Sequence, residues 1–198
     1  MMQAIHAQLG VGQLSFSKGC VTLTVRNLKD ILTVIIPHFE NYPLRGGKNL
    51  AFLRFKMVCL LKVSKMHLQL PVYLQIVKLT CINPDLYAKI MNATIDKFGV
   101  LPDFEILDIH QLAPPLIAAE DMDIDYVTGL IDGDGSITFS FPTSQRKVVS
   151  NIIVTASLDD LEVMNDLVVF FGCGKVYRLK KKAYIFYVSN ASHILNKV

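Results

Sequence analysis

The stretch Tyr126–Phe139, "YVTGLIDGDGSITF", raises a question of electrostatics at a helix end. Its apolar first half predicts a short helix, and its second half alternates as a strand does. Asp132 and Asp134 lie among glycines at the junction between the two. The C-terminus of a helix carries partial negative charge, so each carboxylate there costs roughly 0.3–1 kcal/mol. A metal ion or a positively charged partner would offset this cost.

The composition predicts a folded chain with a sizeable core. The chain has 198 residues, enough for one large domain or two small ones, and 52% of them are hydrophobic. No apolar run approaches the ~20 residues that span a bilayer, so no membrane partner is expected. The N-terminus has no Lys or Arg before Lys18 and shows neither a secretory signal nor a transit peptide. The expected location is the cytosol, or an organelle that makes the protein itself.

Common metal and phosphate motifs do not explain the acidic stretch. "DGDGS" resembles the start of an EF-hand, but counting from Asp132 the required Gly is Ile137 and the required Glu is Thr143. Neither glycine-rich phosphate-binding pattern is present. The four cysteines are Cys20, Cys59, Cys81 and Cys173. They include no C-x-x-C pair, so we expect buried free thiols rather than a zinc site or a disulfide framework.

Charge is divided into three blocks along the chain. Residues 1–80 hold ten basic and two acidic residues, residues 81–126 hold two and nine, and residues 127–198 hold eight and six. Two basic ends joined by an acidic middle suggest two surfaces that meet a polyanion. An ordinary solvated surface gives the same counts, so charge alone does not decide between them.

Two segments, Gly12–Val34 and Gly174–Val198, share the pattern of a glycine, a hairpin and a helix start. At an offset of 163, four residues of the first segment fall on identical residues of the second. They are Val25, Asn27, Ile31 and Leu32, matched by Val188, Asn190, Ile194 and Leu195. The Asn in each copy is a good N-cap for an apolar helix. The pattern predicts a domain-sized duplication, although chance can also produce so few identities.

Periodicity predicts an α+β fold. We expect a hairpin over 13–25, helices over 28–39, 49–62, 71–80 and 84–98, and a Pro-containing linker over 99–120. The second half reads as a helix over 121–134 capped by Asp121 or Asp123, two strands, a helix with Leu158, Leu161, Met164, Leu167 and Phe171 on one face, and a last hairpin. The order αββαββα predicts helices on one side of an antiparallel sheet.

Val127–Gly135, "VTGLIDGDG", resembles the motif that names the LAGLIDADG homing endonucleases, with Thr128 as its least typical residue. "ILTVIIPHFENYPLRGGKNLAFLRF" resembles a segment near the end of a repeat in this family, and "SHILNKV" resembles the start of that segment in a second copy. The resemblance implies αββαββα repeats with a saddle-shaped antiparallel sheet. Residues 1–98 would be the C-terminal part of a first repeat, 99–120 a linker, and 121–198 the N-terminal part of a second repeat, in a chain truncated at both ends.

The resemblance also implies a site. In this family two motif helices pack side by side, and Gly129 and Gly133 would let the backbones approach. Asp134 would be catalytic and a ligand of Mg²⁺, whereas Asp132 would be structural. Lys48 ends "YPLRGGK", where the family carries a basic residue that stabilises charge on phosphate or polarises water. The alternatives are a capped turn for the two aspartates and a surface lysine at a helix start.

By the same resemblance the sheet is the platform for double-stranded DNA. The strand "SITFSF" places its hydroxyl side chains on one face and Ile137, Phe139 and Phe141 on the other. The predicted DNA-binding residues are Ser136, Thr138, Ser140, Arg146, Lys147, Arg178, Lys180, Lys181 and Lys182. A solvated hairpin is the alternative for the basic cluster. The family often has a polar residue, commonly Gln, where this chain has Ala156.

Three functions are open at this stage. The first is a metal-dependent DNA endonuclease encoded in an intron of a mitochondrion or chloroplast, completed as a homodimer through the motif helix or by a missing segment. The second is a maturase that binds intron RNA and does not need Asp134. The third is an inactive remnant of such an endonuclease.

Overall fold

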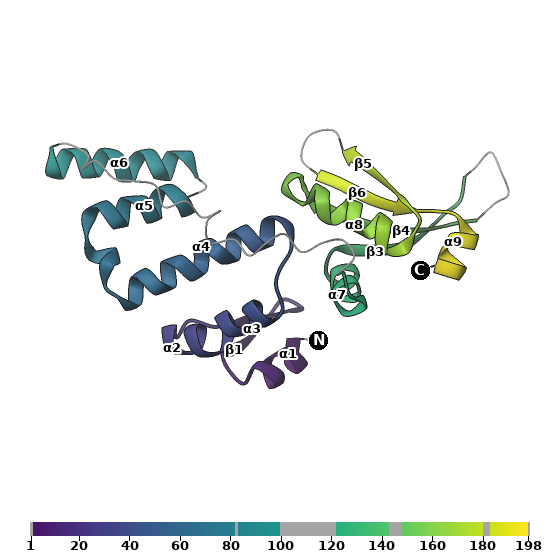
Figure 1. Cartoon of the computed structure of the whole chain (residues 1–198), viewed down its shortest axis with the longest axis horizontal. Helices are drawn as coiled ribbons and strands as arrows, with labels where there is room; N and C mark the ends of the chain where they lie inside the picture. The colour runs from purple at the N-terminus through teal and green to yellow at the C-terminus, as the bar shows by residue number, and fades with distance from the viewer. Residues whose placement is uncertain (1, 82, 100–121, 143–147, 180–182, 198) are drawn as a thin grey trace. The chain divides into compact units, whose positions relative to one another are not determined.

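The computed structural model describes residues 2–81, 83–99, 122–142, 148–179 and 183–197, which divide into two compact units (Figure 1). Unit 1 comprises Met1–Leu44 and Leu50–Ala113, and unit 2 comprises Arg45–Asn49 and Pro114–Val198. The short segment Arg45–Asn49 therefore belongs with the second half of the chain. Of the predicted linker, all but Gly99 lies outside the described residues.

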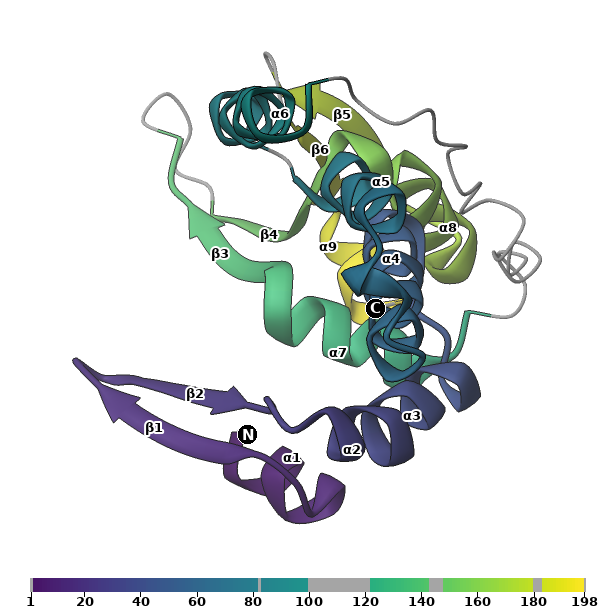
Figure 2. The same cartoon turned by 90° about the vertical axis from the view of Figure 1, so that its left-hand side faces the viewer.

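Unit 1 begins with a helix and a hairpin. Helix α1 (Met2–Leu9) precedes β1 (Gln13–Ser17) and β2 (Cys20–Thr24), which pair in antiparallel fashion (Figure 2). Lys18 and Gly19 between the strands both have positive φ, as the type I′ turns of two-residue hairpins require. The hairpin predicted over 13–25 is confirmed.

The rest of unit 1 is helical. The Asn27 side chain accepts a hydrogen bond from the Lys29 N–H and so caps a segment made of α2 (Leu28–Asp30), a π-helical turn (Ile31–Ile35) and α3 (Ile36–Asn41). After it come α4 (Gly46–Val63), which belongs to unit 1 from Leu50 onward, a 3₁₀ turn (Met66–Leu68), α5 (Leu70–Thr80) and α6 (Pro84–Phe98). In the described part of the chain, none of the helices is both long and apolar enough to serve as a membrane span.

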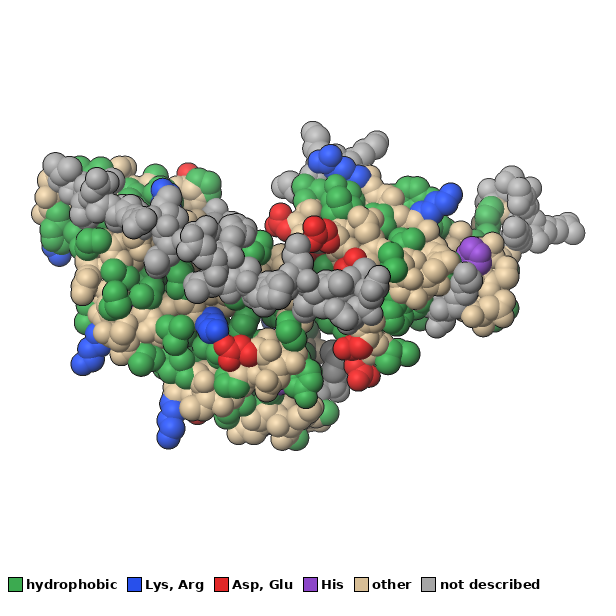
Figure 3. All heavy atoms as spheres, viewed as in Figure 1, with side chains coloured by type: hydrophobic (Ala, Val, Ile, Leu, Met, Phe, Trp, Pro, Cys, Tyr) green, Lys and Arg blue, Asp and Glu red, His purple; other side chains and the backbone are tan. Residues whose placement is uncertain are grey.

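Two small cores hold these helices. One gathers Ile31, Ile36, Phe52 and Cys59, and the other gathers Leu74, Val77 and Met91. Burial raises the pKa of the Cys59 thiol, as expected for a structural cysteine. Apolar side chains also remain at the surface over α5 and α6, including Tyr73 and Phe98 (Figure 3).

Unit 2 has the predicted order of elements. It runs α7 (Ile124–Asp134), β3 (Gly135–Ser140), β4 (Val149–Ser157), a 3₁₀ turn (Leu158–Asp160), α8 (Leu161–Phe171), β5 (Lys175–Leu179), β6 (Ala183–Val188) and α9 (Ala191–Lys197). The four strands lie in the order β3-β4-β6-β5, and each neighbouring pair is antiparallel (Figure 1). The α+β class, with helices on one side of an antiparallel sheet, is confirmed.

The core of unit 2 lies between the sheet and its helices. Val154 and Phe186 on the sheet and Met164 and Leu167 on α8 are all fully buried, and Val127 of α7 joins them. The predicted helix face is confirmed from Leu161 to Phe171, and it was wrong at Leu158, which precedes the helix. The reason is that residues 158–160 form a 3₁₀ turn, so the α-helical spacing does not extend back through them.

The two hairpins repeat one local geometry, each within its own unit. Gly12 and Gly174 share a φ of +95°. A Cβ on Gly12 would collide with Val25 and Leu23, and one on Gly174, 162 positions later, would collide with Val188 and Phe186, which lie 163 positions after Val25 and Leu23. Asn190 caps α9 through the Ser192 N–H as Asn27 caps α2 through the Lys29 N–H. Equivalent contacts at an offset of 162 or 163 residues are what a duplication with a one-residue difference in the hairpin produces.

Candidate functional site

Asp134 is the last residue of α7, and the strand β3 follows it directly. The Asp123 side chain caps the start of this helix by accepting the Tyr126 N–H at 2.6 Å. Tyr126, Val127, Leu130 and Ile131 anchor the helix in the core. Asp132 and Asp134 remain exposed. The structure thus presents the Asp134 carboxylate to solvent at the edge of the sheet.

The glycines of α7 have two different roles. A Cβ on Gly135 would overlap the backbone of Ile131, so only glycine lets the strand begin immediately after the helix. A Cβ on Gly129 or Gly133, in contrast, would meet no atom within 4 Å. These two glycines lie four residues apart on an open helix face, and nothing in the fold of the described chain requires them there.

A metal site is only partly built by the described residues. Asp134 offers the hard carboxylate oxygen that Mg²⁺ prefers. Among the residues whose positions are described, however, no group of three His, Cys, Asp or Glu side chains could hold an ion together. A cation here would need further oxygen ligands from a second carboxylate or from phosphate. The carboxylate of Asp134 is thus a suitable ligand for a divalent cation, but the described residues supply too few ligands to hold one.

Lys48 lies exposed in the first turn of α4, within a segment that is tightly held in unit 2. The Gly47 N–H donates to Asp160 Oδ1 at 2.7 Å. The guanidinium of Arg45 lies 5.3 Å from the centre of the Tyr126 ring and 3.6 Å from Asp166 Oδ2. Unit 2 therefore carries both predicted catalytic residues, Asp134 and Lys48. The sequence alone did not reveal these contacts of Arg45 and Gly47, because the residues that they contact are far away along the chain.

Burial dominates the electrostatics around Arg45. Desolvation raises the pKa of the Tyr126 phenol, although the positive charge of Arg45 opposes the shift. Desolvation also raises the pKa of Asp166, again against the effect of Arg45, and the nearby Glu162 adds to the rise. The separation of 3.6 Å is long for an ion pair, which explains why the pairing does not overcome the cost of burial.

One face of the sheet, called here the polar face, carries a group of polar side chains beside Val149, Ile153 and Ile185. Cross-strand partners point to the same side, so Ser136, Thr138 and Ser140 share their face with Asn151 and Tyr187. Asn151, only 5% exposed, donates to the Ser140 hydroxyl at 3.2 Å and accepts from the Tyr187 hydroxyl at 2.7 Å. The structure brings the three predicted hydroxyls together, and it adds a hydrogen-bonded chain across β3, β4 and β6 that the sequence did not reveal.

The opposite face of β3 is more open than its pattern predicts. Ile137 and Phe139 point to the core side, as expected, but are 69% and 63% exposed, and Phe141 is 70% exposed. The reason is that α8 packs mainly against β4, β5 and β6. Ala156 also packs on the core side, so the polar positions next to it on the opposite face are Thr155 and Ser157.

The register separates Arg178 from the predicted DNA-binding face. Arg178 pairs with Tyr184, and Tyr184 pairs with Ala156 on the core side. The Arg178 side chain therefore leaves the strand on the core side of the sheet and not on the polar face. Lys175 and Tyr177, which were not predicted, occupy the polar side instead. The remaining predicted basic residues lie outside the described residues: Arg146, Lys147, Lys180, Lys181 and Lys182.

The first hairpin carries a second polar face, within unit 1. Its register places Gln13 opposite Thr24, Ser15 opposite Thr22 and Ser17 opposite Cys20, all on one side. The alternation of polar and apolar residues in "QLSFS" and "CVTLT" is the sequence signal of this face.

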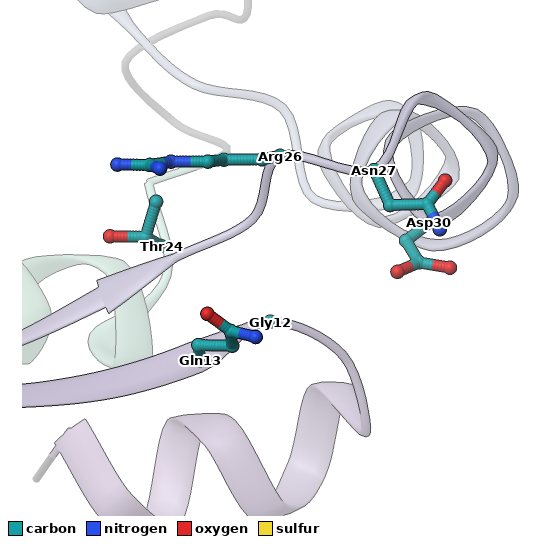
Figure 4. A pocket seen from close by; sticks show the side chains of 6 residues that line it. All are labelled: Gly12, Gln13, Thr24, Arg26, Asn27 and Asp30. Carbon is teal, nitrogen blue, oxygen red and sulfur yellow. The ribbon is translucent and has the colours of Figure 1, made fainter.

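A pocket of about 470 Å³ lies at the base of this hairpin. Figure 4 shows the guanidinium of Arg26 extending on the side of Thr24, away from Asn27 and Asp30. Unit 2 has a pocket of about 270 Å³ at the matching position, lined by Lys175, Tyr187 and Asn190 among others. The duplicated geometry thus extends to a hollow beside each polar face.

Comparison with known proteins places this geometry in a family. The model of the LAGLIDADG endonuclease family matches residues 1–59 and 127–198. The chain is 35% identical over 205 residues to the probable intron-encoded DNA endonuclease 1 of Mycosarcoma maydis, covering 100% of this chain and 74% of that protein. It is 40% identical over 62 residues to the intron-encoded DNA endonuclease aI3 of Saccharomyces cerevisiae, covering 30% of this chain and 15% of that protein.

Solved structures show the same fold. The meganuclease I-SmaMI, bound to uncleavable DNA, superposes with a TM-score of 0.79 at 21% identity, covering 99% of this chain and 66% of that chain. The homing endonuclease I-LtrWI, bound to target DNA, gives a TM-score of 0.77 at 20% identity, covering 99% of this chain and 65% of that chain. The present chain thus spans about two thirds of these enzymes. From its family match and its curated relatives, the chain belongs to the LAGLIDADG endonuclease family.

Proposed function

We propose that this chain is a site-specific, double-stranded DNA endonuclease of the homing type that hydrolyses phosphodiester bonds with the help of a divalent metal. The observation that carries the proposal is the position of Asp134. Its carboxylate is exposed at the end of α7 and adjoins the strand that begins the polar face of the sheet. The curated relatives are named as intron-encoded endonucleases, and I-SmaMI has been solved bound to DNA.

Asp134 would hold the metal, and Mg²⁺ is the ion that its hard oxygen favours. A structure of I-SmaMI with uncleaved DNA includes calcium ions, which supports a site for a divalent cation in such enzymes. When bound, Mg²⁺ would supply activation of water and neutralisation of charge on the phosphate. Lys48 would add a positive charge near the scissile phosphate. Solved variants of I-SmaMI replace lysine by alanine, singly and in pairs.

The polar faces would contact the DNA. In unit 2 the proposed contacts are Ser136, Thr138 and Ser140, with Lys175 and Tyr177 from the last hairpin. Arg146, Lys147, Arg178, Lys180, Lys181 and Lys182 remain proposed phosphate contacts, Arg178 from the tip of its strand. In unit 1 the polar face of the first hairpin is the matching surface. Because most contacts in such interfaces go to phosphates, binding should weaken steeply with salt.

One motif helix gives half of a site. The open face at Gly129 and Gly133 would accept a second motif helix, supplied by a second copy of this chain or by a segment outside it. We further propose that residues 1–98 and 121–198 are parts of two LAGLIDADG repeats joined by the linker 99–120. The intron-encoded relatives support an organellar gene, in a mitochondrion or chloroplast.

The test begins with selection of bound duplexes from a pool of randomised double-stranded DNA, followed by a cleavage assay with Mg²⁺ on the selected sequence. Asp134→Asn should lower the single-turnover cleavage rate by about 10³-fold or more. It should leave affinity unchanged or slightly tighter, because it removes a negative charge that would face phosphate. Asp125→Asn, an exposed carboxylate in the first turn of the same helix, is the matched control.

Other outcomes contradict the proposal in distinct ways. Cleavage that survives Asp134→Asn would remove Asp134 from the site. Preferential binding of structured intron RNA, with no DNA cleavage, would favour a maturase. Binding of neither nucleic acid above a strongly salt-dependent background would indicate an inactive remnant.

A further inference from the structure

The start of α4 is capped by a residue 113 positions away in the sequence. The first N–H groups of a helix have no partner within it, and here the Gly47 N–H donates to Asp160 Oδ1 at 2.7 Å. The other oxygen of the same carboxylate accepts from the Ser157 hydroxyl at 2.6 Å. Both oxygens of Asp160 are therefore engaged, and its negative charge lies where a helix N-terminus favours an anion.

The backbone at this point is shaped to receive Asp160. Gly46 has a φ of +57°, and a Cβ there would overlap Asp160 Oδ1. The N–H of Gly47 can approach the carboxylate only because residue 46 has no side chain. The "GG" of "YPLRGGK" is thus explained by contact with the turn before α8.

A second anchor holds the segment from the other side. The Arg45 side chain is 7% exposed, lies over the Tyr126 ring of α7, and faces Asp166 of α8. Lys48 follows these anchors by three residues or fewer and is the exposed member of the segment. The direction in which its ammonium group projects is therefore set by contacts to both α7 and α8.

We propose that Asp160 and Arg45 are positioning residues that fix the first turn of α4 and so direct Lys48 toward the reacting phosphate. This inference rests on the proposed function, in which Lys48 assists cleavage. Neither residue needs to touch DNA. Their effect on the rate would pass through Lys48, because misplacement of a catalytic group by about 1 Å can cost about 10²-fold.

A double-mutant cycle on the full chain tests the coupling. Lys48→Ala should slow single-turnover cleavage about 10²-fold, and Asp160→Ala should slow it about tenfold to 10²-fold with little change in Kd for DNA. The double variant should be no slower than Lys48→Ala alone, since the second change removes nothing further. Asp160→Asn, which keeps an oxygen for the Gly47 N–H, should retain most of the rate.

A matched control makes the cycle specific. Asp159→Ala removes an exposed carboxylate next to Asp160 and leaves the contact of Asp160 with Gly47 in place, so it should cut at the wild-type rate. If the losses from Asp160→Ala and Lys48→Ala instead multiply, Asp160 does not act through Lys48 and the positioning role is wrong. If Lys48→Ala cuts normally, it is the proposed role of Lys48 that fails.

Hydrogen exchange tests the anchor without any cleavage. Amides of residues 45–49 should exchange about tenfold faster in Asp160→Ala and in Arg45→Ala than in the wild type, and not in Asp159→Ala. A wild-type chain that cuts no DNA would overturn the proposed function, yet the exchange rates would still decide whether Asp160 holds the segment. Unchanged exchange in both variants would overturn the anchor itself.

Discussion

At the residue scale, Asp166 shows how burial can outweigh an ion pair. Its side chain is 20% exposed and faces Arg45, which is 7% exposed, at 3.6 Å. Desolvation nevertheless raises the pKa of Asp166. The folded protein therefore disfavours the charged form of Asp166 relative to the unfolded chain. The carboxylate is better explained as a group that orients Arg45 than as one that stabilises the fold.

The raised pKa gives a pH dependence with a definite sign. Between the ordinary pKa of an aspartate and the higher pKa of Asp166 in the folded protein, the folded state binds more protons at Asp166 than the unfolded state. Stability from this group therefore rises as pH falls through that window and is flat above it. The difference in unfolding free energy between wild type and Asp166→Asn should shift in favour of wild type from pH 7 to pH 4.

Urea unfolding of both proteins at matched pH measures this difference. A difference that stays constant over the range, or that shifts toward Asp166→Asn in acid, would show that the pairing with Arg45 dominates over burial. Subtracting the variant at each pH removes the contributions of all other titrating groups.

At the scale of elements, the polar face of the sheet is tied together by one buried amide. Asn151 also donates weakly to its own strand at the Val149 carbonyl, at 3.4 Å, so its nitrogen faces Ser140 and its oxygen faces Tyr187. The Ser140 hydroxyl therefore accepts from Asn151, which leaves its own proton to donate outward. Ser140 would present a donor to the DNA.

Tyr187→Phe should destabilise the chain by about 1–3 kcal/mol, because the buried Asn151 oxygen loses its donor. It should also relax sequence preference at the base contacted by Ser140, since the amide is then free to turn. Tyr177→Phe is the matched control, because that tyrosine is 50% exposed on the same face and its ring lies 6.4 Å from the ring of Tyr187. Equal urea midpoints for the two variants would refute the role of the amide.

Local patterns made the elements around this face predictable. The cap at Asp123, the alternation of β3 and the glycine-ended helix α8 all follow from chemistry within a few residues. The sequence did not show on which face Arg178 lies. Which residues of β5 point to which face depends on its pairing with β6, and spacing along one strand does not reveal this pairing. The anchors of Lys48 were missed for the same reason, since Gly47 and Asp160 meet only in the folded unit.

At the scale of the whole molecule, α7 has a buried side and a vacant side. Val127 is 3% exposed and belongs to the core, whereas Gly129 and Gly133 have no atom within 4 Å of an added Cβ. Glycine in a helix interior costs about 0.5–1 kcal/mol relative to alanine. No contact in the described fold offsets that cost at these two positions. Close packing of a second motif helix against α7 would offset the cost. It would also bring the carboxylate at the end of that helix toward Asp134.

Gly129→Ala separates the stability of helix α7 from its packing against a second helix. It should raise the Tm of the dilute chain, because alanine has the higher helix propensity and its methyl group meets no described atom. It should weaken self-association, measured by sedimentation at rising concentration, and slow DNA cleavage about tenfold or more, because the methyl group holds the two backbones apart.

Thr128→Ala supplies the control for this change. It also raises helix propensity, at an exposed neighbouring position, and adds no atom to the glycine face, so its Tm should rise while association and cleavage stay as in the wild type. If Gly129→Ala behaves in the same way, the glycine face packs against nothing. If the wild-type chain sediments as a monomer at every concentration and still cuts, one motif helix suffices. If it is monomeric and does not cut, the second helix must come from a segment outside this chain.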